Sequence, residues 1–83
     1  MYVVVDGVLK QLVKVESKGQ VIRVNGKDLY RMVIEQPSDG LTERVYITTT
    51  KNSRKVGEKV SIKCLLYQKR TDKGTYLKVM EVE

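Results

Sequence analysis

The chain has 83 residues, of which 41% are hydrophobic, and a formal net charge of +6, so it is long enough for one domain around a single core. Its longest apolar runs fall far short of the about 20 residues that a membrane-spanning helix needs, and its single cysteine excludes an internal disulfide. With no histidine either, the chain offers little to a metal ion, a cofactor or a catalytic nucleophile, and we expect one non-catalytic domain over residues 1–83.

Short segments of strand-forming residues, separated by glycine-containing turns, make up most of the sequence. Val, Ile and Thr supply 24 of the 83 residues, and their β-branched side chains favour strands. In chain order, we expect strands near residues 8–16, 20–24, 29–35, 41–49, 60–68 and 75–82. We expect turns at the steps Asp6-Gly7, Lys18-Gly19, Asn25-Gly26, Asp39-Gly40, Val56-Gly57 and Lys73-Gly74. This spacing predicts an all-β fold, a small antiparallel barrel of five to six strands whose closure removes exposed strand edges.

Two of the expected turns contain residues suited to a tight reversal of the chain. Asn25-Gly26 supplies two residues that tolerate positive φ, as a two-residue hairpin requires. The run from Pro37 to Gly40 combines a fixed φ, a side-chain acceptor and a permissive glycine. We expect both to join neighbouring strands.

Alternation along the later strands places tyrosines beside basic side chains. Residues at i and i+2 of a strand point to the same face. Three such pairs are expected to face outward: Arg44 with Tyr46, Tyr67 with Lys69, and Tyr76 with Lys78. The opposite registers hold the expected core residues Val45, Ile47, Val60, Ile62, Cys64, Leu66, Leu77 and Val79. A ring beside a cation matches the base and the phosphate of a nucleic acid, although tyrosine also stands half-buried on many sheets for packing alone.

The polar segment from Gln68 to Thr75 is expected to be a turn whose tip could close over a ligand. After it, Met80 and Val82 break the alternation of the last strand, which indicates a bulge.

The remaining two tyrosines are not assigned to the site. Tyr30 shares its face with Met32 and Ile34, so we expect it to pack in the core with its hydroxyl at the rim. Tyr2 has no basic residue at i±2.

The net charge is concentrated between Lys51 and Lys73, where eight basic residues face only Glu58 and Asp72. The rest of the chain is neutral overall, so this segment carries the whole excess of +6. Clustered positive charge is typical of a surface that binds a polyanion, and a merely solvated basic loop is the alternative.

The second half of the chain contains a recognisable pattern: the run VGEKVSIKCLL from Val56 to Leu66, a basic turn ending at Lys73-Gly74, and the strand YLKV from Tyr76 to Val79. Over about 28 residues it resembles the closing strands of OB-fold single-stranded-DNA-binding proteins. The segment from Asn25 to Tyr30 is similar to the Gly-Lys-x-Tyr turn of the small filamentous-phage members. One extra residue precedes Tyr30, so Lys27 is the residue carried over from that turn.

Bacterial housekeeping members of this group place a helix between the third and fourth barrel strands and end in an acidic tail. Residues 50–59 show no apolar stripe and the sequence ends at Glu83, which makes the chain more similar to the phage or plasmid type. The resemblance implies a homodimer or a cooperative array on DNA. It also implies a role in phage or plasmid DNA replication, in the cytoplasm of a bacterial or phage-infected host cell.

The hypothesis from the sequence is therefore an OB-fold protein that binds single-stranded DNA largely without sequence preference, by tyrosine stacking and phosphate contacts. The expected binding residues are Lys27, Arg31, Arg44, Tyr46, Lys63, Tyr67, Lys69, Arg70, Lys73, Tyr76 and Lys78. One alternative is an RNA-binding barrel, of OB or SH3-like type, in a translational complex. Another is a protein-interaction module with an acidic partner, because tyrosine and arginine are also enriched at protein interfaces. No small-molecule substrate and no membrane are expected.

Overall fold

The computed structural model describes residues 1–38 and 41–82, and within them the chain is all-β. Five long strands form the body: β1 (Tyr2–Lys14), β6 (Tyr30–Ser38), β7 (Leu41–Thr49), β8 (Lys59–Thr71) and β9 (Gly74–Glu81). Four two-residue strands lie between β1 and β6: β2 (Glu16–Ser17), β3 (Gln20–Val21), β4 (Arg23–Val24) and β5 (Lys27–Asp28). The predicted all-β class is confirmed. In these described residues there is no helix of the length and apolar character that crossing a membrane requires.

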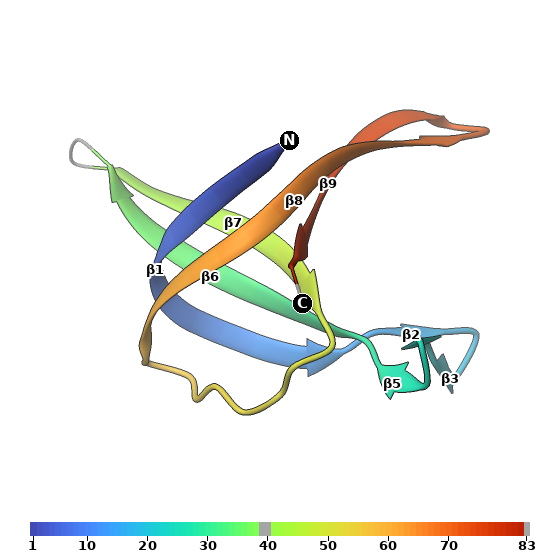
Figure 1. Cartoon of the computed structure of the whole chain (residues 1–83), viewed down its shortest axis with the longest axis horizontal. Helices are drawn as coiled ribbons and strands as arrows, with labels where there is room; N and C mark the ends of the chain where they lie inside the picture. Colours follow the sequence, from blue (N-terminus) through green and yellow to red (C-terminus); the bar gives the residue numbers. More distant parts are fainter. Residues whose placement is uncertain (39–40, 83) are drawn as a thin grey trace.

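The five long strands form a ring in the order β1-β6-β7-β9-β8, and β8 pairs again with β1 (Figure 1). All neighbours are antiparallel except β7 and β9, which run parallel and pair at a single position, Thr48 opposite Met80. The prediction of a purely antiparallel sheet is therefore wrong at this pair. The chain passes through β8 between these two strands. β8 runs opposite to β7, and β9 runs opposite to β8, so β9 has the same direction as β7.

β1 bends so that it can take part in the ring twice. Its first half pairs with β8 and its second half with β6, and the register to β6 shifts between Leu9 and Gln11, as at a β-bulge. The predicted turn at Asp6-Gly7 is wrong, because Gly7 lies within this strand. A Cβ on Gly7 would lie 2.5 Å from the carbonyl oxygen of Glu35, so the glycine permits close approach of the β6 backbone.

The core is formed by the inward registers of these strands. Its buried residues are Val5, Leu9, Met32, Ile34, Ile47, Ile62 and Cys64. Burial raises the pKa of the Cys64 thiol, in keeping with the predicted role of this residue as a core hydrophobe.

A buried carboxylate, that of Glu81, joins the end of β9 to the β7–β8 connection. The Arg54 guanidinium donates two hydrogen bonds to it, at 2.7 and 2.5 Å, and the Thr49 hydroxyl donates a third at 2.6 Å. The Lys51 ammonium lies 3.5 Å away. Burial alone would raise the pKa of Glu81, but the hydrogen bonds from Arg54 and Thr49 and the charges of Arg54 and Lys51 together lower it. Two basic residues of the segment 51–73, Lys51 and Arg54, thus already pair with a carboxylate of the protein itself.

The β8–β9 hairpin extends beyond the core with an unbroken register, from Cys64 opposite Glu81 to Thr71 opposite Gly74. The bulge predicted near Met80 is therefore wrong, and the turn is only the two residues Asp72 and Lys73. The prediction that Leu77 points into the core is also wrong. Leu77 is 67% exposed, because this part of the hairpin extends beyond the core.

Residues 15–29, here called the arm, form two successive short hairpins between β1 and β6 (Figure 1). Their turns, Lys18-Gly19 and Asn25-Gly26, have positive φ at both positions, which confirms the predicted turn chemistry. Backbone hydrogen bonds among Val15, Ile22 and Leu29 join the hairpins at their base and interrupt the strand predicted at 20–24. Residues 39–40 of the turn predicted from Pro37 to Gly40 lie outside the described residues.

Candidate nucleic-acid interface

One face of the β8–β9 hairpin carries two tyrosines and two lysines. Tyr67 lies opposite Lys78 and Lys69 lies opposite Tyr76, and directly opposite residues in an antiparallel pair share a face. We call these four residues the tyrosine face. All four side chains are exposed. Each ring therefore stands beside a lysine both along its own strand and across to the neighbouring strand.

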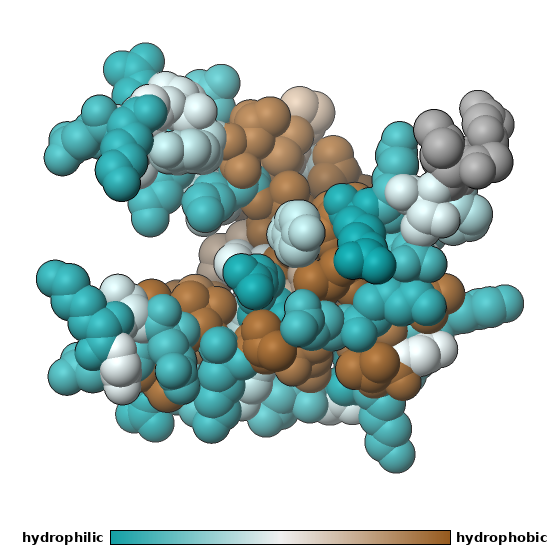
Figure 2. Space-filling model, turned by 180° about the vertical axis from the view of Figure 1, so that it is seen from behind, coloured by the Kyte–Doolittle hydropathy of each residue, from teal (hydrophilic) through white to brown (hydrophobic). Residues whose placement is uncertain are grey.

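A cleft of about 420 Å³ separates the tyrosine face from the arm. The hairpin and β7 contribute Tyr67, Lys69, Lys78, Met80 and Thr48 to its lining, and the arm contributes Val15, Ile22, Val24 and Leu29. Figure 2 shows the hairpin and the arm as two projections on one side of the molecule, with hydrophobic surface at the base between them. The cleft thus has one apolar wall and one wall of aromatic and basic side chains.

Asp28 pairs with one basic residue of the arm and with one residue of β1. Its carboxylate accepts a hydrogen bond from Arg23 Nε at 3.0 Å and lies 3.6 Å from Lys14 Nζ at the end of β1. The hydrogen bond from Arg23 is the largest cause of the lowered pKa of Asp28, and the charges of Arg23 and Lys14 add to it. The apolar wall is therefore tied to the strand that precedes it.

The cations around the cleft are available to a ligand. Within the part of the chain that the structure describes, none of Lys27, Arg31, Lys69, Lys73 and Lys78 forms an ion pair. Lys69 and Lys78 line the cleft, Lys27 lies at the outer turn of the arm, and Lys73 lies at the turn of the hairpin. An anion entering the cleft would therefore displace no internal carboxylate.

The outer face of β6 and β7 continues from the cleft. Arg31 lies opposite Thr48, which lines the cleft, and Tyr46 lies two residues further along β7. A depression of about 390 Å³ follows, lined by Lys10, Gln11, Val33, Arg44 and Tyr46. Glu35 lies 3.7 Å from Arg44 Nε and 3.9 Å from Lys10 Nζ, so this second area has basic side chains that already share a carboxylate.

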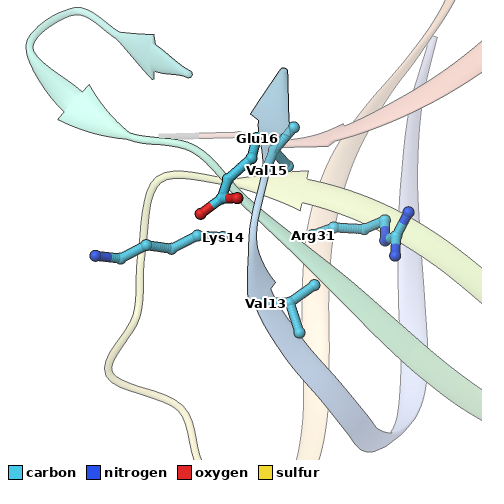
Figure 3. A pocket seen from close by; sticks show the side chains of 5 residues that line it. All are labelled: Val13, Lys14, Val15, Glu16 and Arg31. Carbon is cyan, nitrogen blue, oxygen red and sulfur yellow. The ribbon is translucent and has the colours of Figure 1, made fainter. Parts of the chain in front are cut away.

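A smaller pocket of about 250 Å³ lies at the base of the arm, lined by Val13, Lys14, Val15, Glu16 and Arg31. In Figure 3 the Arg31 side chain and the Lys14 side chain point in opposite directions. Because Lys14 also lies near Asp28, Arg31 is the cation of this pocket that is left to a ligand.

Two of the predicted binding residues lie away from the tyrosine face. Arg70 is opposite Thr75 on the other face of the hairpin, together with Leu77. Lys63 lies on the β1 side of β8, where its ammonium is 5.2 Å from the centre of the Tyr2 ring. Tyr2 thus has the basic neighbour that its own strand lacks, supplied across the sheet.

The apolar wall of the arm was missed by reasoning from the sequence. The signal that could have found it is the pair of glycine turns at Lys18-Gly19 and Asn25-Gly26, with Ile22 between them and partly exposed. Two short hairpins cannot bury such a residue by themselves, which indicates a surface for another group.

Among the described residues, no three side chains of the His, Cys, Asp or Glu type are grouped as a metal site would require. Comparisons with protein-family models, with curated proteins and with solved structures found no match to this chain.

Proposed function

We propose that the protein binds single-stranded nucleic acid, with single-stranded DNA as its principal ligand, in the cleft between the tyrosine face and the arm. The observation that carries this proposal is the cross-strand pairing of Tyr67 with Lys78 and of Tyr76 with Lys69 on one face of the hairpin. Of these four residues, Tyr67, Lys69 and Lys78 line the cleft opposite its apolar wall. A base offers a flat apolar face and its phosphate offers a charge, and each finds a counterpart here. A role in phage or plasmid DNA replication stays a prediction.

We further infer an OB-fold. Numbering the five long strands from one to five gives the ring order 1-2-3-5-4, in which the third and fifth strands are parallel. An OB-fold is a five-stranded Greek-key barrel that binds oligonucleotides on its second and third strands and on the loops after its first and fourth strands. Those parts correspond here to β6 and β7, the arm, and the turn at Asp72-Lys73.

In the proposed complex, Tyr67 and Tyr76 stack on bases, Lys69 and Lys78 contact the adjoining phosphates, and the arm contacts the other side of a base. Stacking contributes about 1–3 kcal/mol per base and is tolerant of sequence. A duplex hides its base faces in its own stack, so only an unpaired strand offers the surface that these rings require.

The test compares the double variant Tyr67→Ala, Tyr76→Ala with the wild type, using fluorescence anisotropy of a labelled oligo(dT). We expect the affinity to fall about 30-fold or more, because two stacked bases are lost. The matched control is Leu77→Ala, an exposed apolar residue on the opposite face of the same hairpin, which should change the affinity by less than about twofold.

A second matched pair of variants compares one basic side chain on each face of the hairpin. Lys69→Ala should weaken binding and Arg70→Ala, its neighbour on the other face, should weaken it much less. Equal effects of these two variants, or equal affinity of the folded double tyrosine variant and the wild type, would refute the proposed site. An RNA oligomer that binds more tightly than DNA of the same sequence would favour the RNA-binding alternative, and equal binding of duplex DNA would exclude stacking.

A further inference from the structure

We infer that Tyr2, at the start of β1, is a further base-stacking residue, and that a long single strand leaves the cleft across β8 toward β1. Tyr2 lies outside the cleft, so this role goes beyond the proposed function, although it also rests on that function. The feature that carries it is a diagonal of three tyrosines on the outer face of three neighbouring strands.

The ladders on the two sides of β8 define this diagonal. In β9, Tyr76 lies opposite Lys69. In β1, Tyr2 lies opposite Leu65. Tyr67 lies in β8 midway between those two positions. Residues 65, 67 and 69 point to the same face of β8, and directly opposite residues share a face, so all three rings stand on one surface.

The spacing of the diagonal suits an extended single strand. Diagonal neighbours on adjacent antiparallel strands lie about 7–8 Å apart. This is about twice the roughly 3.4 Å rise per nucleotide of a stacked strand. A strand that places one base on each ring must therefore be stretched, with its bases separated from one another. A duplex cannot offer its bases in this way.

Each ring of the diagonal also has a lysine beside it. The two rings of the hairpin have theirs within the tyrosine face. At Tyr2, the Lys63 ammonium lies 5.2 Å from the centre of the ring. The Tyr2 side chain is 64% exposed, and Lys63 forms no ion pair among the residues that the structure describes. A base can thus stack on the open side of the Tyr2 ring while Lys63 contacts a phosphate.

The surface between the cleft and Tyr2 is continuous and apolar. Met80, which lines the cleft, lies opposite Leu65, and Leu65 lies opposite Tyr2 on the other side of β8. Both Met80 and Leu65 are partly exposed. Further along the same face of β1 stands the exposed carboxylate of Asp6, which repels phosphate. The path of the strand should therefore end near Tyr2.

The other direction out of the cleft, along β7 toward Tyr46, is less favourable. Tyr46 is 58% exposed, but it lies on a strand that pairs with β9 at a single position. Its basic neighbour Arg44 has its Nε 3.7 Å from the Glu35 carboxylate. A phosphate beside Tyr46 would compete with that carboxylate, whereas a phosphate beside Tyr2 meets a lysine that has no such partner.

The first experiment measures the affinity of oligo(dT) of about 4 to 12 nucleotides for the wild type, Tyr2→Leu and the matched variant Tyr46→Leu. Leucine removes the ring but keeps an apolar side chain. The shortest oligomers, which fill only the cleft, should bind Tyr2→Leu as tightly as the wild type. For the longest, Tyr2→Leu should weaken binding about fivefold or more, because one stacked base is lost, and Tyr46→Leu should weaken it less. Tyr2→Phe should restore the wild-type affinity.

The dependence on length separates the role of Tyr2 from the proposed function. If Tyr2→Leu binds every length as tightly as the wild type, while the double variant Tyr67→Ala, Tyr76→Ala binds weakly, only the role of Tyr2 is overturned. A loss in Tyr2→Leu that is the same at every length, or no larger than that in Tyr46→Leu, would also overturn it. A wild type that binds no oligomer would overturn both the role of Tyr2 and the proposed function.

A measurement on the wild type remains informative if Tyr2→Leu fails to fold. Long oligo(dT) carrying one iodouracil at a chosen position is cross-linked to the protein by ultraviolet light, and the attached residue is identified by mass spectrometry. We expect Tyr2 to be labelled from positions near one end of the oligomer and the hairpin tyrosines from positions further in. If no position labels Tyr2 while some label Tyr67 or Tyr76, the strand does not cross β8, and the role of Tyr2 is overturned.

Discussion

Gly7 shows that a glycine in a turn-like sequence can serve a different purpose, the close approach of two strands. The step Asp6-Gly7 has the composition of a turn, yet it lies within β1, where β6 passes so closely that a Cβ would meet the Glu35 carbonyl oxygen at 2.5 Å and Ile34 Cγ2 at 2.7 Å. The residues next to Gly7 in the sequence could not predict this close approach, because Glu35, which leaves no room for a side chain, is 28 residues away. Asn25-Gly26, by contrast, was predicted correctly because positive φ is a local requirement.

Gly7→Ala should therefore lower the free energy of unfolding by about 1–3 kcal/mol, since the added methyl group displaces backbone and not only a flexible side chain. Urea unfolding followed by circular dichroism measures the change. The matched control is Gly19→Ala, where φ is +77° but no atom lies within 4 Å of the new Cβ, and where the expected loss is about 1 kcal/mol. A loss at Gly7 no larger than that at Gly19 would contradict the close-approach explanation.

At the scale of elements, the strands were predicted best where they cover the core. The strand expected at 41–49 matches β7, and the inward residues Ile62 and Cys64 are buried as the alternation of β8 predicted. Predictions failed at the β8–β9 hairpin, which leaves the core and continues to Thr71 and Gly74, and at the first half of β1, which was not predicted although its Val5 is buried in the core. Alternation of apolar and polar residues reports burial, so it cannot report the end of a hairpin that is exposed on both faces.

The β7–β8 connection is held to the sheet by Glu81, whose carboxylate contacts Arg54, Thr49 and Lys51. Because its pKa is lowered in the folded state, Glu81 stabilises the protein above its unfolded pKa, near its ordinary value of 4.5, and this contribution is lost as pH falls through the lower folded pKa. We expect the difference in unfolding free energy between the wild type and Glu81→Gln to be largest at neutral pH and to shrink on acidification below about pH 5.

Urea unfolding at a series of pH values from 7 to about 3 would measure this difference. Glu43→Gln serves as the control, because Glu43 is exposed and forms no ion pair in the described residues. A wild-type-to-Glu81→Gln difference that is independent of pH would show that the carboxylate charge does not hold the connection.

For the whole molecule, the cations near the cleft come only in part from the basic segment 51–73. The segment 51–73 carries the whole net charge, but Lys51 and Arg54 are held by Glu81, and Arg70 points away from the tyrosine face. Lys27 and Arg31, from outside that segment, lie at the arm and on the adjoining face of β6. The tyrosine–lysine pairs could be predicted because both partners are near in sequence. The position of the arm opposite them could not, because it depends on how the closed ring brings distant residues together.

Five cations therefore surround the proposed path of the ligand: Lys27, Arg31, Lys69, Lys73 and Lys78. If each neutralises one phosphate, log affinity should fall with log salt at a slope of about −3.5. Titrations of oligo(dT) at four salt concentrations measure the slope. Lys27→Ala should make it less negative by about 0.7, and Arg70→Ala should leave it unchanged. A slope near zero would exclude phosphate contacts.

The single parallel contact between β7 and β9 has a consequence for the energetics of the ring. Thr48 and Met80 form the only register position that joins these strands in the described chain, and both residues also line the cleft. A molecule in the cleft therefore touches the two residues at which the ring closes. If it binds the closed ring more tightly than an opened one, mass action requires that it suppress opening at this seam, so backbone amides along β9 would exchange more slowly with solvent when the cleft is filled. Binding in the cleft and closure of the ring are in this way thermodynamically coupled.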